Sequence, residues 1–314
     1  MHRRALIIDC DPGVDDAVAL MLAFGSPEVE LLAVTVVGGN VPVEKTARNA
    51  RMLRRIAGRE DVPVHMGAAR PLRREPAGAG EFHGPEGLGD LAPFEAGAPC
   101  ADGHAADAIV ERVMARPERS VALAVLGPMT NLALALRREP RLARRLGPVA
   151  AMGGARSEGG NITASAEFNV WADPDAAAEV LASGCEVAMF GLDATHQVRA
   201  TDERIGRLAA AGTPMAETAA AMLRFSQRVE REIVGGEAPP VHDPCPVAWL
   251  IRPALFGLEP CRIAVETESG LTRGHTAVEF RPAVAGALPH LWAARADAQG
   301  VFDLIAAAVQ PRTI

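Results

Sequence analysis

Short apolar runs rich in Val, Ile, Leu and Ala alternate along this chain with longer stretches of helical periodicity. Such alternation is typical of βαβ units, in which helices cover a mostly parallel sheet. We therefore expect an α/β fold, a single domain over residues 1–314 with a mostly parallel, Rossmann-like sheet flanked by helices. The runs predict strands at 5–9, 31–37, 62–65, 121–126, 148–152, 186–191 and 261–266, and helices at 15–24, 43–57, 104–116, 129–138, 174–182, 214–231 and 300–309.

Two irregular stretches interrupt the alternation, at residues 67–103 and 235–246. Both are rich in Gly and Pro, and they contain the segments "EFHGPEGLGD" and "GGEAPPVHDPCP". Long irregular segments in a compact domain are usually functional or disordered, and the His and Asp residues inside these two favour function. In an open parallel sheet ligands bind at the carboxyl ends of the strands, so we expect active-site loops at that edge.

Composition excludes several classes of partner. The net charge is −7 and the arginines are scattered, so no basic face is available for nucleic acid. No apolar run approaches the roughly 18 residues of a membrane span, and the apolar run after "MHRR" is too short for a signal peptide. Five dispersed cysteines without a C-x-x-C pair argue against a disulfide framework and a zinc site. We expect a cytoplasmic protein.

Four aspartates fall within eight positions where the first predicted strand ends: Asp9, Asp11, Asp15 and Asp16 in "DCDPGVDD". Two carboxylates about 4 Å apart repel by roughly 4 kcal/mol at an effective dielectric near 20, so such a group calls for a cation. The alternative is that Asp15 and Asp16 only complement the dipole of the helix that follows. Asp11 lies where ligands of a parallel sheet bind, which favours the cation.

Oxygen ligands select Ca²⁺ or Mg²⁺ rather than zinc. An EF-hand loop read from Asp9 fails, because Val14 stands at the glycine position and Leu20 at the bidentate glutamate position. The remaining ligands must therefore come from distant strand ends. The candidate is Asp243 in "VHDP".

The segment "DCDPGVDDAVAL" resembles the D-x-D-P-G-x-D-D-A signature of nucleoside hydrolases of the inosine-uridine type. The resemblance covers most of the chain and implies hydrolysis of the N-glycosidic bond of ribonucleosides to ribose and free base. Relatives form dimers or tetramers, so a homodimer or homotetramer is expected by analogy. Further segments that agree in order are "GGN" (38–40), "GPMTNLA" (127–133), "AEFNVWADP" (166–174) and "HDP" (242–244).

The resemblance implies a Ca²⁺ ion held by Asp11, Asp16, Asp243 and the main-chain oxygen of Leu126, with the ribose 2′ and 3′ hydroxyls completing its coordination. Asp11 would be the general base, because a metal ion lowers the pKa of water and the carboxylate then takes the proton. By the same resemblance, Asp15, Asn40 and Asn169 would contact the ribose or the attacking water. Asn161 and Glu167 would hold the 5′ hydroxyl, and Met152 would line the pocket. The alternative for Asn161, Glu167 and Asn169 is that they cap and form turns in a Gly-rich loop.

His242, beside the proposed ligand Asp243, is the candidate acid for the leaving base, because imidazole titrates near neutral pH. His83 lies in "FHGPEG", where the family also has a His-Gly near the base pocket. Many pyrimidine-preferring members of that family carry tyrosines on the helix before the H-D-P loop, but Ser226 and Glu230 stand in those places here. The choice between purine and pyrimidine nucleosides therefore stays open.

Two other functions are compatible with parts of the sequence. A catalytically inactive Ca²⁺- and ribose-binding module would keep the same ligands without turnover. A haloacid-dehalogenase-like phosphatase could use a D-x-D motif read onto Asp9 and Asp11 or onto Asp11 and Gly13. Such phosphatases commonly need a lysine beside the phosphate, and Lys45, a few residues beyond the second predicted strand, gives no sign of that role.

Overall fold

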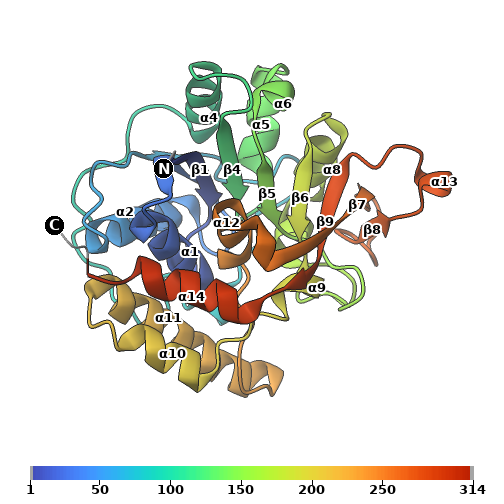
Figure 1. Ribbon diagram of the computed structural model, residues 1–314. Coiled ribbons are helices and arrows are strands. Elements are labelled where there is room, and N and C mark those ends of the chain that lie inside the picture. The colour runs from blue at the N-terminus through green and yellow to red at the C-terminus, as the bar shows by residue number, and fades with distance from the viewer. Residues whose placement is uncertain (1–2, 312–314) are drawn as a thin grey trace.

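Nine strands form the sheet at the centre of the molecule (Figure 1). They are β1 (Arg4–Cys10), β2 (Val29–Val36), β3 (Val64–Met66), β4 (Val121–Val125), β5 (Val149–Met152), β6 (Val187–Phe190), β7 (Phe256–Val265), β8 (Thr276–Glu279) and β9 (His290–Ala296). This computed structural model describes residues 3–311. The spatial order is β3-β2-β1-β4-β5-β6-β9-β7-β8, and all neighbours pair in parallel except β7 with β9 and β7 with β8.

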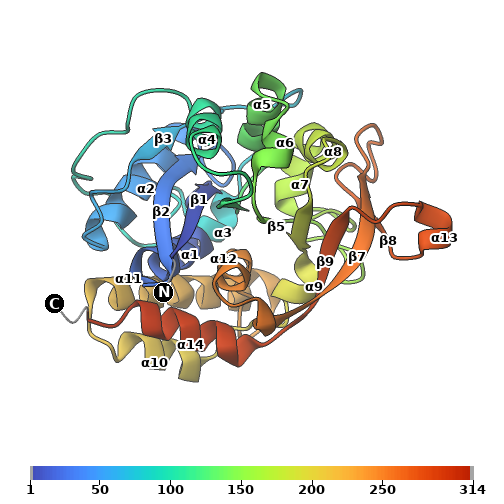
Figure 2. The ribbon, with the colours of Figure 1, turned by 45° about the horizontal axis from the view of Figure 1, so that its top comes forward.

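Helices cover both faces of the sheet (Figure 2). They are α1 (Val14–Gly25), α2 (Val43–Ile56), α3 (Gly80–His83), α4 (Ala105–Met114), α5 (Thr130–Arg138), α6 (Leu142–Arg145), α7 (Phe168–Ala172), α8 (Pro174–Ala182), α9 (Leu192–Thr195), α10 (Asp202–Ala209), α11 (Pro214–Val229), α12 (Pro244–Ile251), α13 (Pro282–Ala285) and α14 (Ala298–Ala308), with a π-helical turn η1 (Glu230–Val234) and a 3-10 turn η2 (Pro253–Leu255). Helices α10, α11, α12 and α14 gather around α1 on one face, whereas α4, α5, α6 and α8 pack on the other.

Strand β1 explains why the chain folds this way. Leu6 and Ile8 belong to the core on the α1 face, and Ala5 and Ile7 belong to the core on the α5 face. Both faces of the strand are buried, which is why its sequence is a continuous apolar run rather than an alternation with polar residues. The prediction of an α/β fold with a mostly parallel sheet is confirmed.

The predicted elements are present, with shifted ends. All seven predicted strands and all seven predicted helices occur, but β8 and β9 and several helices, among them α10 and α12, were not predicted. The predicted loop 235–246 is too long, because α12 begins at Pro244, a residue suited to the first turn of a helix. The predicted helix 214–231 ends at Val229 and continues as the π-helical turn η1.

The parallel pairing brings the carboxyl ends of β1, β2, β4, β5 and β6 to one edge of the sheet. Within residues 3–311, no helix has the length and apolar character that a membrane span requires. The loops after the parallel strands carry most of the candidate residues, so the fold by itself gathers distant segments of the chain at a common edge.

Candidate active site at the carboxyl edge of the sheet

The corner between β1 and α1 is held by Asp16. Its Oδ2 accepts a hydrogen bond from the Gly13 N–H (2.9 Å) and its Oδ1 accepts one from the Asp11 N–H (3.3 Å). The carboxylate therefore binds otherwise unpaired amide groups at the start of α1, as the helix-dipole alternative requires. Its Oδ2 also accepts a hydrogen bond from Asn40 Nδ2–H (3.3 Å), and the carboxylate faces other carboxylates. Helix capping therefore does not account for all of its contacts.

The carboxylate of Asp11 is buried in a slot between two glycines. Its Oδ2 accepts the Asn40 N–H at 2.7 Å, and its Oδ1 is buried without a hydrogen-bond partner among the described residues. A Cβ on Gly39, after β2, would lie 2.1 Å from Asp11 Oδ2, and a Cβ on Gly127, after β4, would lie 2.3 Å from Oδ1. Only glycine leaves room for the carboxylate at these two positions.

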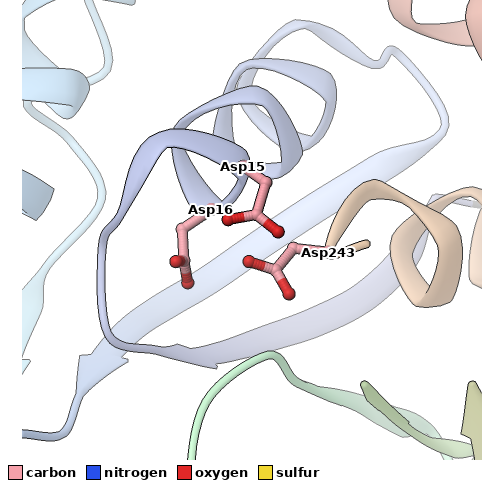
Figure 3. Close-up of side chains that lie close together, drawn as sticks. All are labelled: Asp15, Asp16 and Asp243. Carbon is pink, nitrogen blue, oxygen red and sulfur yellow. The ribbon is translucent and has the colours of Figure 1, made fainter. Parts of the chain in front are cut away.

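Asp15, Asp16 and Asp243 point toward one another (Figure 3). Each offers a carboxylate oxygen, and these oxygens all lie within 4.8 Å of one another. Asp15 and Asp16 come from the first turn of α1, and Asp243 comes from the residue before α12. Sequence positions more than 220 residues apart thus meet in one group of acids. We call Asp11, Asp15, Asp16 and Asp243 the acidic corner.

The electrostatics of the acidic corner are those of like charges out of water. Burial, followed by the charge of Asp16, raises the pKa of Asp11 well above its usual range. Burial and then the charge of Asp15 raise the pKa of Asp16 to about 7, and the same two causes raise the pKa of Asp243 well above its usual range. Within residues 3–311, no arginine or lysine forms an ion pair with these four side chains. An all-oxygen donor set with an unpartnered buried oxygen fits a hard divalent cation.

The carbonyl oxygen of Leu126, at the end of β4, accepts the Asn169 Nδ2–H at 2.7 Å. The same amide lies 3.3 Å from the carbonyl oxygen of Met152, at the end of β5. Asn169 therefore ties together the ends of two neighbouring strands. A carbonyl oxygen has two lone pairs, so Leu126 can accept the amide and still offer a lone pair to a cation.

Glu167 and Asn161 make the capping bonds that were the alternative to a binding role. Glu167 is the N-cap of α7, where its Oε1 accepts the Asn169 N–H at 2.8 Å, and its Oε2 accepts the Gly154 N–H at 2.9 Å. Burial raises the pKa of Glu167 to about 7. Asn161 is exposed, and its Oδ1 accepts the Phe168 N–H at 2.9 Å. The structure does not bring Asn161 into the buried acidic corner.

Two imidazoles lie beside the acidic corner. His83, the last residue of α3, accepts the Val14 N–H at Nδ1 (3.1 Å), and its Nδ1 is 4.0 Å from Asp15 Oδ1. Nδ1 of His242 is 2.7 Å from Oγ1 of Thr195. Burial lowers the pKa of both rings, that of His242 to about 4.

Several supporting residues were missed by sequence reasoning. Asn131 donates from Nδ2 to Asp9 Oδ1 (2.8 Å) and to the Val36 carbonyl (3.0 Å), so it locks β1 against β2. Asn131 lies in the quoted segment "GPMTNLA", which was a signal that it matters. Thr195 had no such signal in the sequence.

The comparisons with known proteins agree with one another. The sequence model of a family described as inosine-uridine preferring nucleoside hydrolase matches residues 6–304. The chain is 40% identical over 309 residues to a pyrimidine-specific ribonucleoside hydrolase RihA of Shewanella sp. (strain ANA-3), covering 96% of this chain and 95% of that one. It is 39% identical over 279 residues to an inosine-uridine preferring nucleoside hydrolase of Crithidia fasciculata, covering 88% of each chain.

Solved structures are similar over nearly the whole length. A plant nucleoside hydrolase, PpNRh1, superposes with a TM-score of 0.93 at 31% identity, covering 98% of this chain and 99% of that one. A purine-preferring ribonucleoside hydrolase from Gardnerella vaginalis superposes with a TM-score of 0.91 at 30% identity, covering 97% and 98%. The fold and the resemblance noted in the sequence are thereby confirmed.

Proposed function

Since this chain belongs to the inosine-uridine preferring nucleoside hydrolase family and is a ribonucleoside hydrolase, we propose how its residues divide the reaction. The observation that carries the proposal is the acidic corner, in which buried carboxylates face one another without a cationic side chain among the described residues. Such a corner suits a cation and, beside it, a sugar that becomes positively charged in the transition state.

The ligands of a Ca²⁺ ion would be Asp11, Asp16, Asp243 and the main-chain oxygen of Leu126. The unpartnered Oδ1 of Asp11 and the oxygen-only donor set support this assignment. Ca²⁺ accepts about six to eight oxygens in flexible geometry, which leaves places for a sugar diol, whereas Mg²⁺ keeps a tight octahedron and several waters. When bound, the ion supplies Lewis-acid chemistry: it lowers the pKa of water and binds vicinal hydroxyls.

Asp11 is the proposed general base. Its Oδ2 is held by the Asn40 N–H, so the carboxylate has a fixed direction, and its Oδ1 is left to accept a proton from the attacking water. The water adds to the anomeric carbon as the bond to the base breaks, and its proton passes to Asp11. Asp15 and Asn40 border the same space and would contact the ribose or this water.

Positive charge develops on the ribosyl ring as the N-glycosidic bond lengthens. The carboxylates of the acidic corner, fixed in place before the reaction, would stabilise that charge. Asn169 and Met152 border the corner at the ends of β4 and β5 and would line the ribose pocket. Glu167 and Asn161 are proposed to meet the 5′ hydroxyl in addition to their capping bonds.

The leaving base becomes electron-rich as the bond breaks and needs a proton or a hydrogen-bond donor. His242 adjoins Asp243 and is the proposed donor to the base, and His83 is proposed to line the base pocket from the other irregular segment. The relatives include pyrimidine-specific and purine-preferring enzymes, so both classes of nucleoside belong in the test.

The test is a panel of inosine, uridine and cytidine, each incubated with the protein after chelator treatment and after readdition of Ca²⁺, with ribose release measured as reducing sugar. We expect release only with Ca²⁺. Binding of nucleosides without ribose release would favour an inactive Ca²⁺- and ribose-binding module. Phosphate release from a panel of phosphate esters would favour a phosphatase, an alternative to which the family match gives no support.

Assembly and location are proposed by analogy and chemistry. A homodimer or homotetramer is proposed by analogy with relatives, and sedimentation tests it. The five cysteines are all free thiols, which fits a reducing compartment such as the cytoplasm, with a role in purine or pyrimidine salvage.

A further inference from the structure

The two imidazoles beside the acidic corner share one arrangement. In each ring the nitrogen Nδ1 is occupied by a neighbouring group, the Val14 N–H for His83 and the Thr195 hydroxyl for His242. Neutral imidazole carries one proton, which sits on one nitrogen while the other accepts. Occupation of Nδ1 by a donor therefore fixes the proton on Nε2.

For His83 the donor is a backbone amide, which has no other role than donor. The Val14 N–H, in the first turn of α1, points at Nδ1 at 3.1 Å, so a proton on Nδ1 would face another proton. The ring of His83 must accept at Nδ1 and carry its proton on Nε2.

For His242 the donor is a hydroxyl, which could in principle donate or accept. Thr195 is fully buried at the end of α9, and its hydroxyl lies 2.7 Å from Nδ1. Helical threonines commonly turn the hydroxyl to the carbonyl one turn earlier, but no such bond is made by Thr195. Among residues 3–311, Nδ1 of His242 is the one hydrogen-bond partner of this hydroxyl, so its proton has Nδ1 as its acceptor.

The opposite nitrogens are open. His242 is half-buried, and Nε2 of neither ring is among the buried polar atoms that lack a partner in the described part of the chain. Nδ1 of His83 lies 4.0 Å from Asp15 Oδ1, and His242 directly precedes Asp243, so both rings adjoin the acidic corner. The two Nε2 atoms thus remain available to donate to a ligand.

We propose that Thr195 is a positioning residue that fixes His242 in the tautomer with its proton on Nε2, matching the tautomer that Val14 imposes on His83. This inference rests on the proposed function only in that the leaving base is the acceptor of the Nε2–H of His242. The Thr195 hydroxyl holds the plane of the ring, and no proton is transferred through it. The leaving base then meets a directed N–H.

The primary test is the ¹⁵N spectrum of the histidine rings in protein labelled at histidine, in the presence of Ca²⁺, with His83→Gln and His242→Gln used to assign the signals. Long-range ¹H–¹⁵N correlations distinguish a proton on Nδ1 from one on Nε2. We expect the Nε2–H pattern for both rings in the unmodified protein. In Thr195→Val, which keeps the shape of the side chain without its hydroxyl, His242 should change to a mixture of tautomers while His83 keeps its pattern.

Activity gives the second readout. Thr195→Val should lower kcat/KM for inosine and uridine about tenfold, the order of one lost hydrogen bond, and leave p-nitrophenyl riboside nearly unchanged because its leaving group needs little help. Thr195→Ser, which restores the hydroxyl, should recover both the Nε2–H pattern and the activity on natural nucleosides.

A proton on Nδ1 of His242 in the unmodified protein would overturn the inference, whatever the stability of the variants. An unchanged His242 pattern in a folded Thr195→Val protein would overturn it as well. The spectra do not require turnover, so an inactive enzyme with the expected tautomers would count against the proposed function alone. An active enzyme with the wrong tautomer would count against Thr195 alone.

Discussion

The acidic corner and the pair of histidines beside it are built on opposite principles. In the corner, Asp11, Asp16 and Asp243 are buried with like charges against one another and with no cationic side chain among the described residues. Each histidine has a donor supplied by the chain itself. Among the described residues nothing neutralises the corner, whereas the histidines are positioned by the fold. Substitutions should therefore have different signatures in the two regions.

The largest effect is expected for Asp11→Asn. Loss of the proposed base, which is also a proposed metal ligand, should lower kcat/KM for every nucleoside by at least about 10³-fold. The same change removes one of the buried like charges, so the melting temperature in the presence of a chelator should rise. Steady-state assays and thermal melts measure both effects.

The exposed Asp102 provides a matched control, since Asp102→Asn should change neither activity nor melting temperature measurably. A lower melting temperature of Asp11→Asn in chelator would mean that the corner is not strained by its charges. The proposed contrast would then be wrong for the acidic corner, because its like charges would not destabilise the folded protein.

A selective effect is expected for His242→Ala. The rate on inosine and uridine should fall by about 10² or more, whereas the rate on p-nitrophenyl riboside should fall only a few-fold, because its leaving group departs without a proton donor. The melting temperature in chelator should not rise, in contrast to Asp11→Asn. Equal losses on both kinds of substrate would remove His242 from its role at the leaving base.

The smallest effect is expected for Asn49→Ala, which tests the link between the two regions. Asn49 is buried, and its Nδ2 donates to the Pro12 carbonyl in the β1–α1 turn (3.1 Å) and to the Glu86 carbonyl in the segment after His83 (2.8 Å). Loss of these bonds leaves two carbonyls without this donor and should cost about 1–3 kcal/mol of unfolding free energy. We also expect KM to rise more than kcat falls.

Lys45→Ala is the matched control. Lys45 forms an ion pair with Glu86 of the same segment (2.8 Å), but both side chains are 35% exposed. Such pairs contribute about 0–1 kcal/mol, so denaturant unfolding should separate the two variants. If Lys45→Ala proved as costly as Asn49→Ala, the segment would be held by charge rather than by the buried amide.

The parts of the site that could be predicted are those whose requirements are local in the sequence. The strand-to-helix corner needs particular residue types at a fixed spacing, so its motif can be recognised in the sequence. Its residues are Asp11, Pro12, Gly13, Asp15 and Asp16. The parallel sheet was predictable for the same reason, because strands such as β1 are buried on both faces and appear as continuous apolar runs.

The remaining parts depend on contacts between distant segments. The segment "LDATHQV" contains no pattern that predicts a hydrogen bond between the Thr195 hydroxyl and His242, 47 positions later. Glu167 was expected at the 5′ hydroxyl, but its carboxylate also caps α7, a bond that depends on where that short helix begins. Strand β9 has one exposed arginine, Arg295, and three small alanines, so its apolar pattern is too weak to be distinguished from a loop.

The glycine slot around Asp11 has a consequence for engineering. Neither Gly39 nor Gly127 touches a substrate in the proposed mechanism, and neither has a backbone conformation that demands glycine. Even so, a single added methyl group at either position would overlap the carboxylate of Asp11, the proposed general base. A mutational library aimed at a new base specificity should therefore keep glycine at these two positions, although neither has a side chain that could contact a ligand.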